Sequence, residues 1–246
     1  PKFIRLIKKH IGLDYDAMII GHPGQHVMPV VRFLTKKPRV LNVLVGYHEL
    51  FPEREPTKEW SFKAKALHYL DKKSFKWADL VLADTKQHIN YFRHTSGLKK
   101  SKFLRVFVGT DDEVFHPISI EKNHNDFIVM FWGMFNPIHG VQHIIKAAKL
   151  LGVYKDIKFE IFGFGETFES VKKLHERLRI SNVTFHTQWV PYEQLPNYIA
   201  KADVCLGIFG GTPLAMRVVP NKAYEALAMQ KPLLTGSSPG IKEVLT

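Results

Sequence analysis

The feature that most constrains the fold of this 246-residue chain is a regular alternation of apolar, strand-like runs with amphipathic helical segments. In the first part of the chain, the predicted strands cover residues 15–25, 38–49, 78–85 and 103–110, and the predicted helices cover 27–36, 58–78 and 86–97. Strands separated by helices form parallel sheets with helices on both faces. Gly97 closes the last of these helices, because glycine is the usual residue just past a helix end.

A polar stretch interrupts this alternation at residues 111–126, DDEVFHPISIEKNHND, which has no periodicity and predicts an interdomain linker. The alternation then restarts, with strands predicted at 127–133, 157–165, 182–190 and 203–209 and helices at 141–152, 166–180, 193–202 and beyond residue 218. We therefore expect an α/β fold of two Rossmann-like domains, residues 1–118 and 119–246, with a cleft between them. Ligands bind at the carboxyl ends of the strands in open parallel sheets.

Composition narrows the class of partner. The formal net charge is +12 and the pI is about 9.6, so the surface attracts phosphate in nucleic acid, anionic lipid or nucleotide. No run of about 18 apolar residues is present, so we expect no transmembrane segment. The single Cys205 excludes an internal disulfide framework and is typical of a reducing compartment, so we expect a cytoplasmic protein.

Both ends of the sequence predict that the chain continues. Residue 1 is proline, without an initiator methionine, signal peptide or tag. The last residues, PGIKEVLT, stop inside a predicted helix. We therefore expect both domains to be incomplete.

The stretch VVPNKAYEALAMQKP, residues 218–232, places three polar groups at the start of an alanine-rich helix. One interpretation is a plain capped helix, with Asn221 as the N-cap, Lys222 in solvent and Glu225 in the first turns. The alternative is a ligand site. A lysine at a helix N-terminus is electrostatically unfavourable unless an anion compensates it, and this conflict favours a site for a phosphate-bearing ligand.

Glycine turns precede this helix in the second domain. Gly133 ends a predicted strand and His139 stands just before the next helix, where backbone N–H groups and the helix dipole favour an anion. Gly163 and Gly165 form a second turn, which lacks the third glycine of a dinucleotide fingerprint. Either turn alone is an ordinary strand–helix connection; together they predict walls of a nucleotide site.

Two cations follow a further glycine turn, Gly210-Gly211, in the sequence. Arg217 and Lys222 could both meet a diphosphate, the arginine in a bidentate manner. Glu225 follows about one helical turn later, and its carboxylate can accept two hydroxyl hydrogen bonds from a ribose. These residues predict binding of a nucleoside diphosphate.

Four segments of the chain resemble the family-4 glycosyltransferases, which have the GT-B fold. The segments are RVFVGTDDEVFHP, GMFNPIHGVQHIIKAAKLL, WVPYEQLPNYIAKADVCLGIF and VPNKAYEALAMQKPLLTGSSPGIKEVL. The resemblance covers most of the chain and is specific from residue 103 onward. Before that residue it depends on ADLVLADT and on the strand order.

The resemblance implies a role for several residues. The family's ribose-binding carboxylate falls on Glu225, whereas the family's second glutamate, eight positions earlier, is replaced here by Arg217. The family's basic pair in the first loop falls on Met134 and His139, so Arg217 and Lys222 are expected to compensate. A family histidine near the reacting sugar falls on His48, with His22 as the alternative.

The resemblance also implies the chemistry. It predicts a retaining, metal-independent transferase that moves a sugar from a UDP- or GDP-sugar to a hydroxyl acceptor, with Arg217, Lys222 and His48 acting in catalysis. The Asp111-Asp112 pair belongs to the linker, and no carboxylate pair is evident for double displacement. We expect no separate cofactor, because the nucleotide sugar is the donor substrate.

The expected acceptor is a glycan, a glycolipid or a polysaccharide precursor, and the basic surface fits peripheral contact with anionic lipid at the inner face of the membrane. The sequence leaves three alternatives open. They are a nucleotide-sugar epimerase or hydrolase of the same fold, a basic nucleic-acid-binding protein without enzymatic activity, and an inactive relative that only binds. No nucleic-acid-binding motif is recognised, so nucleic acid is not an expected partner.

Overall fold

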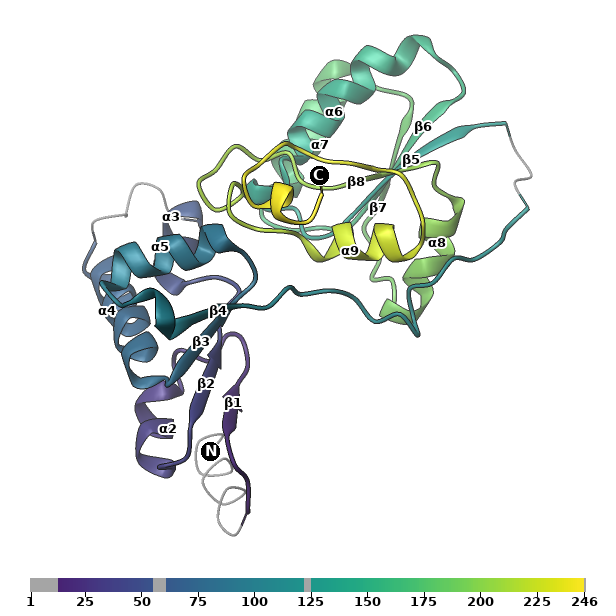
Figure 1. Cartoon of the computed structure of the whole chain (residues 1–246). Helices are drawn as coiled ribbons and strands as arrows, with labels where there is room; N and C mark the ends of the chain where they lie inside the picture. The colour runs from purple at the N-terminus through teal and green to yellow at the C-terminus, as the bar shows by residue number, and fades with distance from the viewer. Residues whose placement is uncertain (1–12, 55–60, 122–124, 246) are drawn as a thin grey trace. The chain divides into compact units, whose positions relative to one another are not determined.

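The computed structural model describes residues 13–54, 61–121 and 125–245. The chain divides into two compact units, unit 1 (Pro1–Phe107) and unit 2 (Val108–Thr246), and each unit is described by itself. Each contains one parallel sheet with helices packed on it (Figure 1). This α/β architecture of two Rossmann-like units confirms the predicted fold class.

Unit 1 is built on a four-stranded parallel sheet in the order β1-β2-β3-β4. Its elements in the described residues are β1 (Met18–Ile20), α2 (Met28–Leu34), β2 (Arg39–Asn42), α3 (Tyr47–Arg54), α4 (Phe62–Trp77), β3 (Leu80–Ala83), α5 (Lys86–Ser96), a 3₁₀ turn (Lys100–Lys102) and β4 (Phe103–Arg105). Residues 58–60 of the predicted helix 58–78 lie outside the described residues.

The core of unit 1 lies on one face of this sheet. Ile20, Leu41, Val81 and Phe103 are in register across the four strands, and all four are buried. They pack with side chains from α2, α4 and α5. Gly97 ends α5 in the left-handed conformation, with φ of 72°, as the sequence predicted.

The predicted strand at residues 38–49 is wrong beyond Asn42. The chain leaves the sheet there, and α3 begins at Tyr47. The apolar run VLNVLV continues past the paired residues, so its composition does not mark where the strand ends. A tertiary contact supports the start of the helix: the backbone N–H of His48 donates to the carboxylate of Asp71, which comes from α4, at 2.8 Å.

Unit 2 is built on a five-stranded parallel sheet in the order β7-β6-β5-β8-β9. Its elements are β5 (Phe127–Trp132), α6 (Val141–Leu150), β6 (Ile157–Phe162), α7 (Phe168–Leu178), β7 (Val183–His186), α8 (Leu195–Lys201), β8 (Val204–Leu206), α9 (Asn221–Ala228) and β9 (Leu233–Leu234). Short 3₁₀ turns lie at Pro137–His139, Leu151–Val153, Tyr192–Gln194 and Ile241–Glu243.

Both faces of the sheet in unit 2 are covered, because the central strands alternate apolar side chains between two cores. Val129 and Phe131 of β5 pack with residues of α6 and α7. Met130 and Trp132, the next residues along the same strand, pack with α8 and α9 on the opposite face. This near-continuous apolar run is typical of a parallel strand that is buried on both sides.

The polar segment that predicted a linker packs onto unit 2. Phe115 is fully buried beside Met130 and Trp132, and its ring contacts Tyr192 edge-on with the centroids 5.0 Å apart. For this reason the division between the two compact units falls between Phe107 and Val108, whereas the sequence predicted a boundary at residue 118. Residues 122–124 of this segment lie outside the described residues.

None of the helices in the described ranges is both long enough and apolar enough to cross a lipid bilayer.

Candidate functional site

The central feature of the site in unit 2 is a lysine buried at the start of α9. Pro220 occupies the N-cap position with an extended backbone, and no side chain caps the helix. Asn221 is therefore the first helical residue and is exposed, whereas Lys222 is only 5% exposed. The interpretation of Asn221 as N-cap and Lys222 as a solvated charge is wrong.

The ammonium group of Lys222 lies over an aromatic ring and beside a glycine. Its Nζ is 3.7 Å from the centroid of the Phe131 ring, which is a favourable cation–π position. A Cβ atom built on Gly133 would lie 3.0 Å from Nζ, so a larger residue at position 133 would press on the lysine. The end of β5 and the start of α9 thus form one small region.

This ammonium group has no hydrogen-bond partner, although it is buried. Burial lowers the pKa of Lys222 well below its usual value, and the negative charge of Glu225 only partly opposes that shift. An unsatisfied buried donor is unusual in folded proteins. An acceptor that the described residues do not supply, such as a water molecule or a ligand group, would satisfy it.

His139 lies next to the same glycine. A Cβ on Gly133 would lie 3.3 Å from Cε1 of His139, and the imidazole contacts the Phe131 ring edge-on at 5.7 Å between centroids. The Nδ1–H of His139 donates to the carbonyl oxygen of Met134. Burial and the charge of Lys222 lower the pKa of His139 to about 3. His139 is thus neutral near pH 7 and adds no positive charge to the site.

Glu225 lies one helical turn after Lys222 on the same side of α9. Its carboxylate is 8% exposed and accepts a 2.6 Å hydrogen bond from the indole Nε1–H of Trp132. Burial raises the pKa of Glu225, while the indole and Lys222 act in the opposite direction. The hydrogen bond fixes the orientation of the carboxylate and leaves its other oxygen available to a further donor.

The second glycine turn serves the packing of two backbones. A Cβ on Gly163 would lie 2.0 Å from the carbonyl oxygen of Gly133, and a Cβ on Gly165 would lie 2.6 Å from that of Phe135. Both glycines have positive φ, 133° and 152°. Gly163 and Gly165 therefore hold the two turns against each other, and ligand contact by these glycines stays a prediction.

Arg217 lies in the loop before α9 and is half-buried. Its backbone N–H donates to the carbonyl of Leu214 at 2.9 Å, and its own carbonyl is so close to Gly240 that a Cβ there would approach to 2.6 Å. These contacts fix the backbone at position 217, and a contact between the guanidinium and a phosphate stays a prediction.

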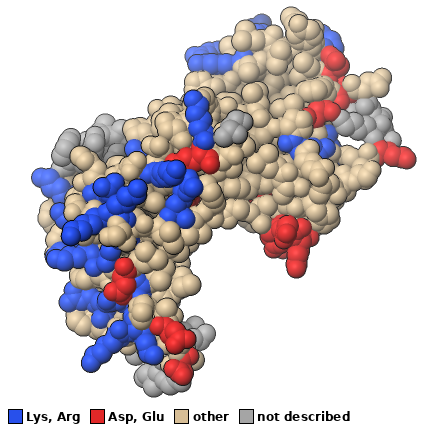
Figure 2. Space-filling view, in the orientation of Figure 1, with Lys and Arg blue, Asp and Glu red and all other residues tan. Residues whose placement is uncertain are grey.

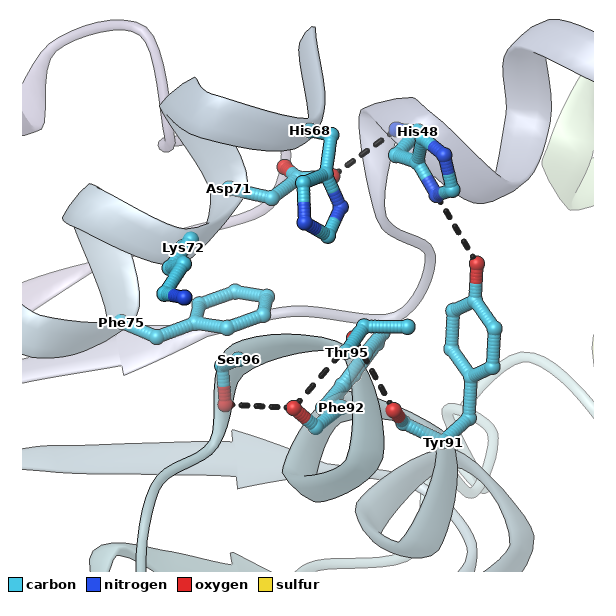
Figure 3. Close-up of a pocket in the computed structure, with 9 residues that line it drawn as sticks. All are labelled: His48, His68, Asp71, Lys72, Phe75, Tyr91, Phe92, Thr95 and Ser96. Carbon is cyan, nitrogen blue, oxygen red and sulfur yellow. Dashed lines mark hydrogen bonds between the residues drawn. The ribbon is translucent and has the colours of Figure 1, made fainter. Parts of the chain in front are cut away.

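His48 of unit 1 is held by contacts from two neighbouring helices (Figure 3). Its backbone N–H is bonded to Asp71 of α4, and its Nδ1 lies 3.2 Å from the hydroxyl of Tyr91 on α5. The ring also contacts His68 edge-on, with the centroids 4.6 Å apart. These residues line a cavity of about 10 Å³, enough for one water molecule. The other candidate, His22, is exposed at the end of β1.

Sequence reasoning missed several residues that the structure brings into these regions. In unit 2 they are Phe131 and Trp132, which contact Lys222 and Glu225. A tryptophan in a buried strand is a usable signal, because its N–H must find an acceptor. In unit 1 the missed residues are Asp71 and the buried network of Glu49, Asp84 and His88. No spacing in the sequence joins these four, since they come from separate helices and the end of a strand.

Among the residues that the structure describes, no three histidine, cysteine, aspartate or glutamate side chains are grouped in a way that could hold a metal ion.

Comparison with protein families gives one match. The family model described as glycosyl transferases group 1 matches residues 112–246, which is more than half of the chain. The candidate residues of unit 2 lie inside this range. A comparison with curated protein sequences gives no match.

Comparison with solved structures finds similar proteins over nearly the whole chain. A sucrose-phosphate synthase from Thermosynechococcus elongatus is 18% identical with a TM-score of 0.78, and the match covers 100% of this chain and 62% of the synthase. Anabaena HepE in complex with UDP-glucose is 17% identical with a TM-score of 0.72, covering 100% of this chain and 66% of HepE. WaaG, a glycosyltransferase involved in lipopolysaccharide biosynthesis, is 14% identical with a TM-score of 0.69. The match covers 89% of this chain and 64% of WaaG.

At these identities the likeness shows the fold, which is the predicted GT-B architecture. The chain spans less than two thirds of the length of each of these three proteins.

Proposed function

Since the chain belongs to the glycosyl transferases group 1 family, we propose that it transfers a sugar from a nucleoside-diphosphate donor to a hydroxyl acceptor. The observation that carries this proposal is the buried ammonium of Lys222, which has no acceptor within the protein. A β-phosphate oxygen would supply that acceptor and would replace the solvation that the lysine loses on burial.

The proposed donor site uses the start of α9. The first backbone N–H groups of a helix have no partner within the helix, and here no side chain caps them. They and Lys222 would meet the diphosphate together. Gly133 permits close approach at this point, because a side chain there would contact both Lys222 and His139.

We propose that Glu225 accepts hydrogen bonds from the ribose hydroxyls of the donor. Trp132 holds one carboxylate oxygen at 2.6 Å, so the group is oriented before the ligand arrives. The neutral His139 would contribute through its Nε2, which is an acceptor because Nδ1 carries the hydrogen. Arg217 and Asn221 are proposed as further phosphate and donor contacts.

In the proposed reaction, the bond between the anomeric carbon and the β-phosphate oxygen breaks, and a bond from that carbon to the acceptor oxygen forms. The nucleoside diphosphate leaves with the bonding electron pair, and its departing β-phosphate oxygen takes the proton that the acceptor hydroxyl loses. Lys222 stabilises the negative charge that develops on the leaving phosphate. Retention of anomeric configuration and transfer without a metal ion are part of the proposal and come from the family resemblance.

The donor nucleotide proposed is UDP or GDP. HepE, a protein with this fold, has been solved with UDP-glucose, which favours UDP. His48 is proposed to act near the reacting sugar. The proposed acceptor is a glycan, a glycolipid or a polysaccharide precursor, reached by peripheral contact with an anionic membrane from the cytoplasm. The alternative that keeps the same site is a nucleotide-sugar epimerase or hydrolase.

The test is a binding panel by isothermal titration calorimetry with UDP, GDP, ADP and the corresponding glucose derivatives. We expect UDP or GDP to bind, and we expect the Lys222→Met variant to lose that binding, while the exposed Lys242→Met variant in the same unit keeps it. Absence of binding by every nucleotide would contradict the proposed site. Release of free sugar in the presence of acceptors, without a glycosylated product, would favour the hydrolase.

A further inference from the structure

The positive charge of the protein is concentrated in unit 1. The described residues of unit 1 contain 16 lysines and arginines against 7 aspartates and glutamates, whereas those of unit 2 contain 13 against 14. Three of the seven acids in unit 1, Glu49, Asp71 and Asp84, are buried. The surface of unit 1 therefore carries a larger excess of basic over acidic side chains than the unit as a whole. Figure 2 shows Lys and Arg gathered over its visible face.

One helix of this unit presents its cations together with aromatic rings. At helical spacing along α4 lie Phe62, Lys65, Tyr69, Lys72, Lys73 and Lys76, which we call the α4 stripe. Phe62 is 88% exposed and Tyr69 is 60% exposed. The opposite side of α4 carries the buried residues, among them Asp71, the only acid of the helix. The stripe thus contains four lysines and no carboxylate.

A neighbouring helix extends the stripe at its C-terminal end. Trp77 follows Lys73 by one turn, and the guanidinium of Arg32, from α2, lies 4.6 Å from the centroid of the Trp77 ring. The same guanidinium lies 4.3 Å from the centroid of Phe33, which is 77% exposed. A third exposed aromatic ring, Phe33, and a fifth cation, Arg32, therefore adjoin the α4 stripe.

Exposed phenylalanine and tyrosine rings between lysines fit one kind of partner. A lipid surface accepts apolar rings at the level of its headgroups, and its anionic lipids attract lysine ammonium groups whose stems lie along apolar surface. Double-stranded nucleic acid would also use the lysines, but it gives no reason for phenylalanine at nearly full exposure on a regular helix face. A single strand would stack its bases on such rings, so the test below includes an oligonucleotide. Large exposed apolar side chains rimmed by polar ones mark interaction sites.

We propose that the α4 stripe docks unit 1 on an anionic lipid bilayer, with α4 lying along the membrane surface. This inference gives the proposed membrane contact a defined surface, and in that respect it rests on the proposed function. Vesicle binding and nucleotide binding are measured separately, so either proposal can fail while the other holds.

The test is sedimentation of the full 246-residue chain with large unilamellar vesicles in 0.1 M salt. One set of vesicles is an equal mixture of phosphatidylglycerol and phosphatidylcholine, and the other is phosphatidylcholine alone. The test variant carries Lys65, Lys72, Lys73 and Lys76 changed to Gln. The matched control carries the same change at four exposed lysines of unit 2, Lys146, Lys149, Lys172 and Lys173, so that both proteins have the same net charge.

We expect the wild type to bind the anionic vesicles and not the neutral ones. Since each lysine near an anionic surface contributes roughly a fivefold increase in partitioning, the test variant should bind at least about 100-fold more weakly. The control should bind like the wild type. A second variant, Phe62→Ser with Tyr69→Ser, should also weaken binding, which separates the aromatic contribution from charge. Circular dichroism of each variant checks that the fold is retained.

Three results would overturn the proposal. The first is no binding of the wild type to anionic vesicles. The second is equal loss of binding in the test and control variants, which would show an effect of net charge without a defined surface. The third is binding of a 20-nucleotide oligonucleotide that depends on the same four lysines, together with no vesicle binding, which would assign the stripe to nucleic acid.

Discussion

The two units each bury a positively ionisable side chain, but the groups that surround the two side chains differ. His88 of unit 1 is fully buried between two carboxylates: its Nδ1 lies 2.6 Å from Asp84, and its Nε2 faces Glu49 at 3.4 Å as an ion pair without a hydrogen bond. Lys222 of unit 2 is almost as buried, but its ammonium contacts only the face of Phe131 and has no hydrogen-bond partner. Burial acts on both groups, and the neighbours decide the outcome.

The pKa values record this difference. Burial alone would lower the pKa of His88, but Asp84 and Glu49 raise it to about 9. For Lys222 burial prevails, and the pKa falls well below its usual value. His88 has two carboxylates that compensate its charge within the protein, whereas the ammonium of Lys222 has no ion-pair partner at contact distance and so is the candidate for an external anion. The comparison therefore separates a structural network from a candidate site.

The largest effect is expected from His88→Ala. Removal of the imidazole leaves Glu49 and Asp84 buried without a counter-charge, so the free energy of unfolding should fall by about 3–5 kcal/mol. Chemical denaturation followed by circular dichroism measures it. His94→Ala, at an exposed position on the same helix, is the control and should change stability little. An equal, small effect of both variants would show that the network does not stabilise unit 1.

The pH dependence of wild-type stability gives an independent check of the same network. The folded-state pKa of about 9 lies above the ordinary value of 6.5. The stability that His88 contributes is therefore complete below pH 6.5 and is lost as the pH rises through 9. Hydrogen exchange of backbone amides in α5 should accelerate over this range beyond its intrinsic pH dependence.

Lys222→Met should give the next largest effect, which is a loss of catalytic activity. The loss of one group that stabilises the leaving phosphate should reduce kcat by about 100- to 1000-fold with a donor that the wild type uses. Stability should stay equal or rise, because methionine removes an unsatisfied buried charge while it keeps the volume. If Lys222→Met lost as much stability as His88→Ala and kept the wild-type kcat, Lys222 would be a structural residue. That result would contradict the contrast between His88 and Lys222.

Glu225→Gln should weaken donor binding by about tenfold, which corresponds to the loss of one charge-assisted hydrogen bond to the ribose. The amide keeps the shape of the side chain, so the bond with Trp132 can persist. Glu193→Gln, at an exposed position in the same unit, is the control. The effect should disappear when the ligand is inorganic pyrophosphate, which has no ribose. A similar loss with pyrophosphate would assign Glu225 to the diphosphate region instead.

The smallest effect is the uptake of a proton on donor binding. The pKa of Lys222 is lowered in the free protein, and a bound phosphate would raise it again. Binding of UDP should therefore take up a fraction of one proton, and the affinity should fall as the pH rises from the lowered pKa of the free protein toward the ordinary lysine value. Calorimetry in HEPES and in Tris, which differ in ionisation enthalpy, measures this uptake. Heats that do not depend on the buffer would contradict it, and Lys222→Met should abolish the dependence.

Much of the fold followed from local patterns in the sequence. The alternation of apolar runs with helical segments predicted the parallel sheets, and every observed strand from β1 to β8 lies within a predicted one. The family likeness from residue 103 onward is confirmed by the match over residues 112–246. The error at residues 38–49 arose because strand and loop share one apolar run, and the capping carboxylate of Asp71 lies 23 residues away.

The candidate site was predictable in part. Lys222, Glu225, Gly133 and His139 were selected from the sequence, and the structure brings all four to one end of the sheet. The pattern did not reveal that Lys222 is buried or that His139 is neutral. Both facts depend on Phe131, Trp132 and the Met134 carbonyl, which surround these side chains only after β5 and α9 have packed together.

The sequence by itself determined which segments form strands and helices, because hydrophobic periodicity, glycine positions and helix propensity act over a few residues. Only the tertiary structure decided which charges are satisfied. Whether a lysine is solvated, paired or left without an acceptor depends on the groups that packing places within a few ångströms of it, and these come from distant parts of the chain. His88 and Lys222 differ for this reason, although both are charged residues in the first turn of a helix.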